Sequence, residues 1–593
     1  MRRLILGAFI CFFAVGFSLS CLDMSEQAEQ ASPRKILFES NIGGNMEVFV
    51  INSDGTDPIN LSHRPGYDGT PSWSADGSRI IFSSDRDAGA KRGNDVYIMN
   101  ADGTNVQRIT TDSKGYAFPT LSPDSRWIAF DAARDSENPQ VWIMSVDGSN
   151  MKRLTFSDTP EGYCSWTADS RRIGFDTFRD GHSEIYTINA DGSDPFRITH
   201  FEAHVGDPRI SPNGQQLAFE TGKDGNSEIY VINLDGSDPK RLTNNPADDR
   251  SPAISDDGKQ VVFSSDRDGE REQFELFIMD IDGSNLRKIE TPGAVNLYPT
   301  FAPERIKVLI IDGINNHDWE KTTAAAKATL EQTGRFEVDV STSPRKKAPA
   351  EEWQAWRPIF SNYQVVVSNY NDDWEEEKGE TLWSEETKAD FERFVREGGG
   401  FVPIHAADNA SADWVEYNEM IGLGGWGGRE AGKSGYLLRL IDGTWQATSP
   451  NEGASGDHGP EREFLVVHDQ PEHPILRGLP TEWMHAKDEL YASMRGPAKN
   501  IEVLAHSYSL FTKENEPVLM LITYGKGQVF HIALGHYNDE SPPFGVAVHC
   551  VGFQTVLARG TEYVATGRVT IGFPDSFPGK EKPAIVAPNE VVW

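Results

Sequence analysis

The chain has 593 residues, of which 38% are hydrophobic, and its 90 acidic and 56 basic residues give a formal net charge of −34. This length exceeds what one hydrophobic core supports, and after the first residues no apolar run is long enough to cross a bilayer. The negative charge repels phosphate backbones and anionic head groups, which argues against nucleic-acid binding. We therefore expect a globular protein with more than one domain.

Residues 1–21 have the pattern of an export signal. Arg2 and Arg3 precede an apolar run over residues 4–17, and small residues then lead to Cys21. We expect this segment to be absent from the mature protein. The protein is then expected to be exported, either to the periplasm or to the outer membrane or cell surface.

The end of the signal leaves the fate of Cys21 open. Residues 18–21, Ser-Leu-Ser-Cys, are similar to a lipoprotein cleavage box, although leucine is expected where Ser18 stands. Lipidation of Cys21 and simple cleavage are both consistent with this pattern, and membrane contact is expected only through such a lipid. Residues 22–34 are polar and are expected to form a linker. Cys164 and Cys550 are expected to be buried free thiols.

Between residues 35 and 304 one sequence motif is repeated six times. The period of about 45 residues is typical of a four-stranded propeller blade. Each repeat contains a short apolar strand with a polar residue at either end. These strands are expected at residues 47–52, 95–100, 140–145, 184–189, 228–233 and 275–280. An Asp-Gly pair such as Asp54-Gly55 follows each strand, because glycine tolerates the positive φ of a tight hairpin. Calcium binding by these acidic turns is the less favoured alternative.

The ends of the repeat region complement each other. The last repeat stops at residues 299–303 without its final apolar strand, whereas an unmatched strand of that type stands at residues 36–40. We expect the N-terminal strand to complete the sixth blade, because such closure removes free sheet edges. The prediction is an all-β, six-bladed propeller.

The repeats resemble the TolB-like (WD40-like, PD40) propeller family. The resemblance rests on Ser-Asp-Arg-Asp-Gly at residues 265–269 and Ser-Asp-Arg-Asp-Ala at residues 84–88, each of which precedes the apolar strand. It implies a propeller of the cell envelope that contacts proteins or glycans, and hence an envelope protein partner. A propeller by itself specifies no function.

From residue 306 the pattern changes to alternating strands and helices, which indicates a mostly parallel sheet. Strands are expected at residues 308–311, 336–340, 365–368, 401–404 and 529–534, and helices at residues 322–332 and 384–397. We place an α/β domain over residues 306–570 and a C-terminal tail over residues 571–593.

In open α/β sheets ligands bind at the carboxyl ends of strands. The polar residues at those ends are Asn316, His317, Asp318, Asn369, His405, Asp408 and His536.

The same region resembles the ThuA-like (trehalose utilisation) family. The matching segments are Asn316–Trp319, Gly398–His405, His473–Ile475, Lys487–Tyr491 and Tyr524–Gly527 with Gly535-His536. The resemblance implies a fold like that of class I glutamine amidotransferases, which is flavodoxin-like, with His405 where those enzymes place a nucleophilic cysteine. A cysteine-dependent amidotransferase is thereby excluded. An insert over residues 430–463 is expected to cover the strand ends and to contribute His458.

The resemblance also implies carbohydrate metabolism, with a disaccharide, a glycoside or its 3-keto form as substrate. His405 and Glu489 are the expected acid/base pair, the glutamate having its pKa raised by partial burial, and His536 completes the catalytic set. The expected substrate-binding residues are Asn316, His317, Asp318, Trp319, Asn369, Asp408, Trp414, Trp426 and His458. No cofactor is required by this reading. A divalent metal held by His317, His405, Glu489 and His536 is the alternative.

Each of these residues also has a structural explanation. Histidines after strands are often only hydrogen-bonded, Asp488-Glu489 and His317-Asp318 are able to cap helices, and tryptophans are usually core residues. Three functions therefore stay open: a carbohydrate-processing enzyme of isomerase, lyase or hydrolase type; a non-catalytic sugar- or protein-binding scaffold of the envelope; and a metal-dependent hydrolase.

Overall fold

The computed structural model describes residues 33–593 except 90–92, 270, 294, 373–381, 427–428, 434, 455, 538–544 and 575. The expected export signal, Cys21 and most of the expected linker lie outside the described residues. In the part of the chain that is described, no helix combines the length and the apolar character needed to cross a membrane. Cys164 and Cys550 are buried free thiols, as predicted.

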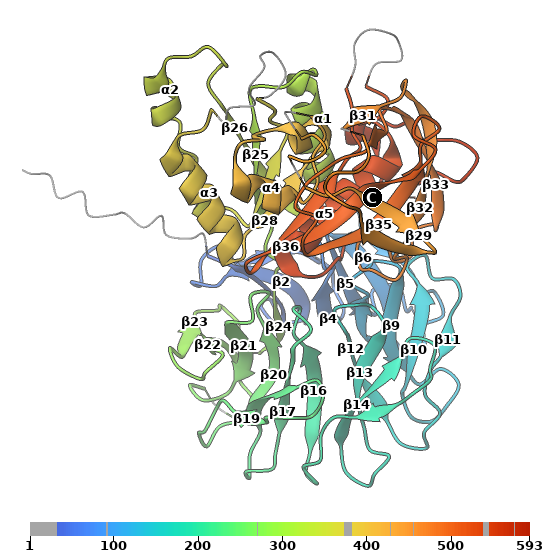
Figure 1. The fold of residues 1–593 in the computed structure, drawn as a ribbon. Helices are drawn as coiled ribbons and strands as arrows, with labels where there is room; N and C mark the ends of the chain where they lie inside the picture. Colours follow the sequence, from blue (N-terminus) through green and yellow to red (C-terminus); the bar gives the residue numbers. More distant parts are fainter. Residues whose placement is uncertain are drawn as a thin grey trace, which may run out of the picture. The chain divides into compact units, whose positions relative to one another are not determined.

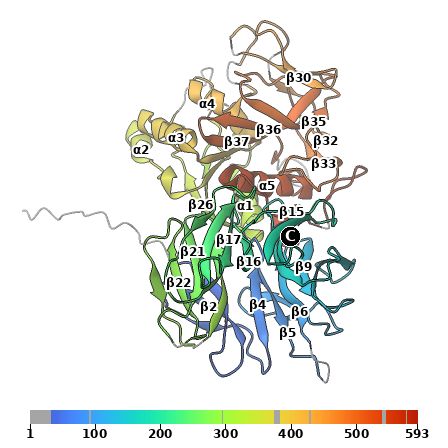
Figure 2. The ribbon, with the colours of Figure 1, turned by 90° about the horizontal axis from the view of Figure 1, so that it is seen from below.

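The N-terminal half folds into six four-stranded antiparallel sheets, which follow one another in chain order (Figures 1 and 2). From the inner strand outward they are β4 (Asp68–Trp73), β5 (Arg79–Ser84), β6 (Asp95–Asn100), β7 (Gln107–Arg108); β8 (Ala117–Leu121), β9 (Trp127–Ala132), β10 (Gln140–Ser145), β11 (Lys152–Arg153); β12 (Glu161–Trp166), β13 (Arg172–Thr177), β14 (Glu184–Asn189), β15 (Phe196–Arg197); β16 (Val205–Ile210), β17 (Gln216–Thr221), β18 (Glu228–Asn233), β19 (Lys240–Arg241); β20 (Asp249–Ile254), β21 (Gln260–Ser265), β22 (Glu275–Asp280), β23 (Arg287–Ile289); and β24 (Asn296–Phe301), β1 (Lys35–Ser40), β2 (Glu47–Asn52), β3 (Ile59–Asn60). Contacts between successive inner strands run from β4 through β24 and back to β4. The predicted six-bladed propeller is confirmed.

The first strand of the propeller closes the ring against the last one. β1 pairs antiparallel with β24, so that Ile36 lies opposite Phe301. The Ser40 Oγ donates to Asn296 Oδ1 at 2.7 Å in the same pair of strands. The predicted closure by the N-terminal strand is therefore confirmed, and all six strands predicted from the repeat have the expected bounds.

The acidic residues of the hairpins stabilise their own turns. The Asp54 Oδ1 accepts the Thr56 backbone N–H at 3.0 Å, and Gly55 adopts a φ of +88°. Hydrogen bonds from Thr56 lower the pKa of Asp54. The same bond recurs at Asp102, Asp147, Asp191, Asp235 and Asp282. These contacts favour turn chemistry over calcium binding.

The arginine of the Ser-Asp-Arg segment ties two strands of one blade together. Arg86 Nη2 donates to the buried Asp68 Oδ2 at 2.8 Å, and its guanidinium lies 5.1 Å from the centre of the Phe82 ring. In the last complete repeat, Arg267 contacts Asp249 at 2.7 Å. The repeated arginine thus pairs with a buried carboxylate and covers an aromatic core residue.

Each inner strand contains a bulge, and buried carboxylates from neighbouring blades bind the bulged backbone. The bulges hold residues with φ between +47° and +55°, namely Thr70, Phe118, Tyr163, Asp207, Ser251 and Tyr298. The Thr70 N–H donates to Glu39 Oε2 at 2.6 Å, and the Tyr163 N–H donates to Asp131 Oδ1 at 3.3 Å. Burial raises the pKa of both carboxyls to about 7. These bonds connect adjacent blades near the axis of the ring.

Asp131→Asn should stabilise the propeller more at high pH than at low pH. The folded state holds the proton of Asp131 up to about pH 7, whereas an unfolded aspartate loses it near ~4. The contribution of Asp131 to stability therefore falls as pH rises from ~4 to ~7 and is constant above that. Between pH 5 and pH 8 the difference in free energy of unfolding between the variant and the wild type should increase by about 2.6 kcal/mol in favour of the variant.

Chemical denaturation of the full chain at both pH values measures this difference. The exposed Asp158, replaced by asparagine, is the matched control and should show no pH-dependent gain. Equal effects of Asp131→Asn at pH 5 and pH 8 would contradict the raised pKa.

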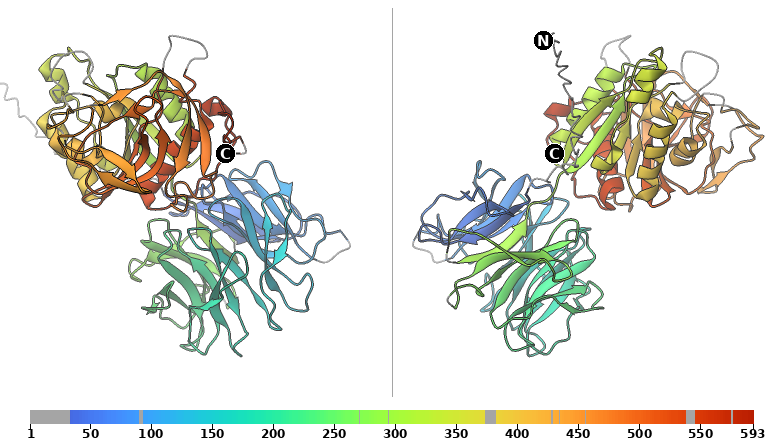
Figure 3. Two further views of the ribbon diagram at one scale, coloured as in Figure 1. Left: turned by 45° about the vertical axis from the view of Figure 1, so that its right-hand side comes forward. Right: turned by 90° about the vertical axis from the view of Figure 1, so that its left-hand side faces the viewer.

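The C-terminal half is built on one nine-stranded sheet with the order β26-β25-β27-β28-β37-β36-β35-β32-β33. Figure 3 shows this half of the chain in two further views. The strands are β25 (Ile306–Asp312), β26 (Phe336–Thr342), β27 (Val365–Ser368), β28 (Gly400–Pro403), β32 (Arg462–His468), β33 (Glu482–Asp488), β35 (Ile501–Tyr508), β36 (Asn515–Tyr524) and β37 (Gly527–Ile532). Strands β26, β25, β27, β28 and β37 are parallel, and the remaining pairs are antiparallel. The predicted α/β fold class is confirmed.

Helices cover both faces of this sheet, because its strands alternate their buried side chains. Val308 and Ile310 pack with helices α1 (Trp319–Gln332) and α5 (Val551–Thr566). Leu309 and Ile311 pack with α3 (Glu385–Glu397) and α4 (Val415–Ile421) on the other face. The helical segments are α1 (Trp319–Gln332), α2 (Ala350–Ala355), η1 (Phe360–Asn362), α3 (Glu385–Glu397), η2 (His405–Asn409), α4 (Val415–Ile421), α5 (Val551–Thr566) and η3 (Pro588–Glu590). Ser384 caps the start of α3, and Gly398 ends it with a φ of +126°.

Candidate functional site

Three histidines follow strands of the sheet and meet at one edge. His317 follows β25, His405 follows β28 and His536 follows β37, and these strands run parallel, so their carboxyl ends lie on the same side. The ring centres of His317 and His536 are 4.3 Å apart, and His405 lies 5.2 Å and 5.3 Å from them. The predicted convergence of imidazoles is therefore present in the structure.

His405 sits in a tight turn that aims its ring at Glu489. It has a φ of +45°, a conformation that is uncommon for residues other than glycine. The Nδ1 lies 3.1 Å from the Ala533 carbonyl oxygen, which accepts its proton. The buried Nε2 has no hydrogen-bond partner among the described residues and lies 3.7 Å from Glu489 Oε2. Burial opposes the charged ring, but the carboxylates of Glu489 and Asp488 outweigh burial and raise the pKa of His405.

Glu489 is surrounded by imidazoles. Its carboxylate lies 3.7 Å from His405 Nε2, 3.7 Å from His458 Nε2 and 4.0 Å from His536 Nε2. Burial works toward a higher pKa, but these rings lower the pKa of Glu489 to about 2. The expected upward shift is therefore wrong, because the nearby imidazoles have a larger effect than burial. Glu489 stays a carboxylate at neutral pH.

Asp488 positions the residues on both sides of the site rather than capping a helix. This fully buried carboxylate accepts from His485 Nε2 at 2.7 Å, from the Gly535 N–H at 2.9 Å and from the His536 N–H at 3.2 Å. It stands at the end of β33, next to Glu489, and holds the turn that follows β37. The helix-cap alternative for Asp488 is excluded by these contacts.

The segment after β25 combines a helix cap with a site residue. Asp318 Oδ1 accepts the Lys321 N–H at 3.1 Å and so caps α1, as the structural alternative proposed. His317 instead faces the other histidines, and its Nε2 lies 3.0 Å from the Asn316 amide nitrogen. Burial, together with the nearby rings of His405 and His536, lowers the pKa of His317 to about 2. The same two causes, burial and His405, lower the pKa of His536.

The insert brings His458 to the site. Strand β31 (Asp457–His458) pairs with β34 (Tyr491–Ala492), so that His458 lies opposite Tyr491. The hairpin of β29 (Leu438–Ile441) and β30 (Thr444–Ala447) makes up another part of the insert. The Tyr491 ring stacks on His405 at 4.3 Å and meets the edge of Trp426 at 4.8 Å.

These groups line a pocket of about 290 Å³. The lining residues are Asn316, His317, Asn371, Asn409, Trp426, His458, Glu489 and Tyr491. The pocket therefore combines side-chain amides, imidazoles, one carboxylate and two aromatic rings, which are groups suited to hydroxyl-rich ligands.

Five of the expected substrate-binding residues do not line this pocket, namely Asp318, Trp319, Asn369, Asp408 and Trp414. Asp408 is fully buried against His531, with 3.1 Å between Oδ2 and Nε2. Trp414 packs in the core against Trp383, Phe391 and Tyr417. The Asn369 amide donates to the Trp319 carbonyl at 3.1 Å, so the side chain of Asn369 and the backbone of Trp319 join strand and helix.

Three residues that line the pocket, Asn371, Asn409 and Tyr491, are not among the predicted binding residues. Tyr491 belongs to the Lys487–Tyr491 segment, and Asn371 follows a predicted strand, so both carried a usable signal. Asn409 lies in the 3₁₀ turn after His405, and its Oδ1 accepts the Gly425 N–H at 3.0 Å. Nothing in the sequence around Asn409 indicates that contact.

Family models match both halves of the chain. The model described as TolB beta propeller domain matches residues 27–138 and 163–347, and the model described as ThuA, trehalose utilisation, matches residues 307–564. This chain belongs to the TolB beta propeller and ThuA families. Its ThuA domain contains the histidine cluster and the pocket.

Solved structures resemble each half separately. A putative ThuA-like protein from Parabacteroides merdae is 38% identical over 48% of this chain and 99% of its own, with a TM-score of 0.44. TolB from Acinetobacter baumannii is 20% identical over 46% of this chain and 67% of its own, with a TM-score of 0.40. Putative TolB from Agrobacterium tumefaciens is 21% identical over 46% and 92%, with a TM-score of 0.37. No protein with a curated description matches this chain.

Asp488→Ala should strongly destabilise the ThuA domain. The change leaves the buried His485 without its carboxylate and two backbone N–H groups without their acceptor. Breaking such a buried pair costs about 3–5 kcal/mol, which corresponds to a Tm lower by about 10 °C for a domain of this size. Calorimetry of the full chain measures the change. Glu514→Ala, at an exposed hairpin residue, is the control and should leave the Tm unchanged. If Asp488→Ala also left the Tm unchanged, a positioning role for Asp488 would be excluded.

Proposed function

We propose that the ThuA domain binds a small carbohydrate, namely a disaccharide or glycoside or its 3-keto form, and catalyses a proton transfer on it. The observation that carries this proposal is the facing pair of His405 Nε2 and Glu489 Oε2, 3.7 Å apart beside a polar, ring-lined pocket. The match to the trehalose utilisation family supports the substrate class.

The pocket supports recognition of hydroxyl groups. Asn316, Asn371 and Asn409 offer amide donors and acceptors, which match the alternating donors and acceptors of a sugar. Trp426 and Tyr491 meet edge to face at 4.8 Å and provide apolar surface beside these amides. A volume of about 290 Å³ suits a small molecule rather than a polymer chain.

His405 is the proposed proton-transfer residue. Its Nδ1 proton is held by the Ala533 carbonyl at 3.1 Å, so Nε2 is the nitrogen that exchanges protons with a substrate. Glu489 faces that nitrogen and stabilises the imidazolium once it forms. Such a pair serves either proton abstraction next to the carbonyl of a 3-keto sugar or protonation of a glycosidic oxygen.

The propeller is proposed as a docking module for a protein of the cell envelope, which the match to the TolB beta propeller family supports. Export to the envelope stays a prediction from residues 1–21, which lie outside the described residues. A non-catalytic scaffold differs from this proposal in one measurable respect, since it binds sugar or protein without turnover.

The proposal predicts separate effects for His405, which lies beside the pocket, and Trp426, which lines it. In the full chain, His405→Gln should lower turnover at least about 100-fold, the usual contribution of a general acid or base, while it changes sugar affinity little. Trp426→Ala should weaken sugar binding about tenfold through lost ring contact. Trp445→Ala, a half-buried tryptophan of the insert outside the pocket lining, is the matched control.

Thermal unfolding with a panel of disaccharides and their 3-keto derivatives identifies the ligand. A sugar at 100 times its Kd adds about 2.7 kcal/mol of stability, and a product assay with that sugar then measures turnover. Stabilisation without turnover in the wild type would favour the scaffold. No stabilisation by any sugar would refute the substrate class.

A further inference from the structure

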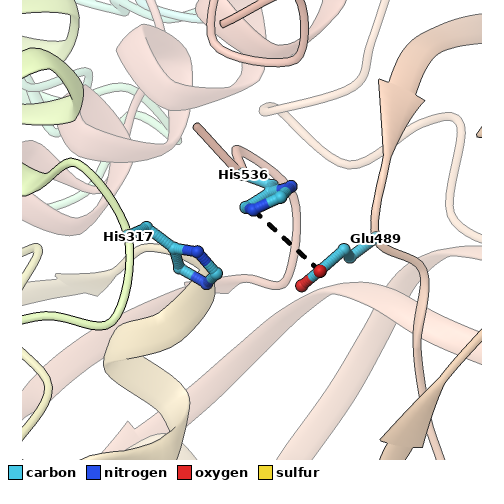
Figure 4. A group of neighbouring side chains, drawn as sticks. All are labelled: His317, Glu489 and His536. Atoms are coloured by element: carbon cyan, nitrogen blue, oxygen red, sulfur yellow. Dashed lines mark ion pairs between the residues drawn. The ribbon is translucent and has the colours of Figure 1, made fainter. Parts of the chain in front are cut away.

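We propose that His317, Glu489 and His536 bind a divalent first-row metal ion such as Zn²⁺. One ligand atom from each residue lies within 4.8 Å of the other two. The three side chains come from three separate strand ends and point toward one another (Figure 4). The His536 Nε2 and Glu489 Oε1 atoms are 4.0 Å apart.

The ligand set favours this class of metal. Two imidazoles and one carboxylate form a three-residue site that leaves a coordination position for water or substrate, as in zinc enzymes. Bonds of ~2.0–2.1 Å in a tetrahedral site place ligand atoms about 3.3 Å apart. The ligand atoms of His317, Glu489 and His536 lie within 4.8 Å of one another. Side-chain rotations therefore suffice to bring them to the distances that a bound ion requires. Magnesium prefers oxygen ligands and is disfavoured here.

The surroundings of His536 are those of a metal ligand. Its Nδ1 lies 3.5 Å from Glu461 Oε1, which leaves Nε2 directed at Glu489. Histidines that bind metals commonly give their second ring proton to a carboxylate, which fixes the ring and the tautomer. The backbone of His536 is held in addition by Asp488, through an N–H bond of 3.2 Å.

The surroundings of His317 fit the same role. The Asn316 amide lies 3.0 Å from His317 Nε2, and the oxygen and nitrogen of such an amide are assigned from their contacts. Asn316 Oδ1 accepts from Asn371 Nδ2 at 3.0 Å. The Asn316 oxygen therefore reaches His317 Nε2 when both amides are turned together, and it then holds the ring proton there. Nδ1 of His317 is then the atom that binds the metal.

The two oxygens of Glu489 allow the metal and His405 to act together. Oε1 faces His536 at 4.0 Å, whereas Oε2 faces His405 at 3.7 Å. One carboxylate therefore binds the ion through Oε1 and contacts the proton-transfer histidine through Oε2. A metal at this point would polarise a carbonyl or hydroxyl oxygen of the substrate. This last role rests on the proposed function, whereas metal binding itself does not.

The test is metal binding by the full chain. After chelator treatment and dialysis, calorimetric titration with Zn²⁺, Mn²⁺ and Mg²⁺ should show about one equivalent of Zn²⁺ bound per chain, with Mg²⁺ bound far more weakly. His317→Ala, His536→Ala and Glu489→Gln should each lower the Zn²⁺ affinity at least 100-fold. His405→Ala should retain the metal, since its Nε2 belongs to the proton-transfer pair.

His458→Ala is the matched control, because His458 also lies 3.7 Å from Glu489 yet stands outside the proposed ligand set. Its Zn²⁺ affinity should stay within a few-fold of the wild type, and thermal unfolding of each variant verifies the fold. The proposed site would be overturned if the wild type bound neither Zn²⁺ nor Mn²⁺ stoichiometrically. It would also be overturned if the His317 and His536 variants bound the metal as tightly as the wild type. Sugar stabilisation measured in the metal-free chain separates this failure from failure of the proposed function.

Discussion

The site of the ThuA domain depends on the buried carboxylate of Asp488. It joins the end of β33 to the turn after β37 by accepting from His485 and from two successive backbone N–H groups. Burial works against a charged imidazole, but Cys550 and Asp488 outweigh it and raise the pKa of His485 to about 9. The buried pair therefore remains ionised at neutral pH. Glu489 follows Asp488 directly, and His536 follows Gly535. The hydrogen bonds of one carboxylate, that of Asp488, therefore set the positions of two site residues.

The cluster around Glu489 shows how burial and neighbouring charges shift the pKa values of one set of histidines in opposite directions. His317 and His536 have lowered pKa values, since burial and a nearby imidazole both oppose a second positive charge. His405 alone among the three strand-end histidines has a raised pKa, because carboxylates outweigh its burial. The two carboxylates of Asp488 and Glu489 thus favour the charged form of His405 more than that of the other two rings.

The architecture was predictable because its signals are local and repeated. Asp-Gly turns, apolar strands and the unmatched first strand each specify nearby backbone geometry, and the repeat multiplies every one of them by six. The convergence of His317, His405 and His536 followed from a topological rule for parallel strands.

The direction of the side chains that come after each strand was not predictable from that rule. Asp408 and Trp414 stand in the expected segments but point into the core. Asp408 contacts His531 there, and Trp414 packs against Trp383. The lowered pKa of Glu489 arises from rings far away in the sequence, including His458 of the insert.

The pairing of β1 with β24 also sets a constraint on how the propeller folds as it is synthesised. Ser40 and Asn296 bond across the closing blade at a sequence separation of 256 residues. At ~5–20 residues per second the ribosome needs on the order of tens of seconds to supply the second partner after the first. During that interval the inner edge of β1 lacks its native neighbour, and an unpaired strand edge invites pairing with other chains. Glu39, close to the end of β1, sets a negatively charged side chain at that edge while it is still in water. The strand that finally closes the ring is therefore also the one whose early exposure most needs to be controlled.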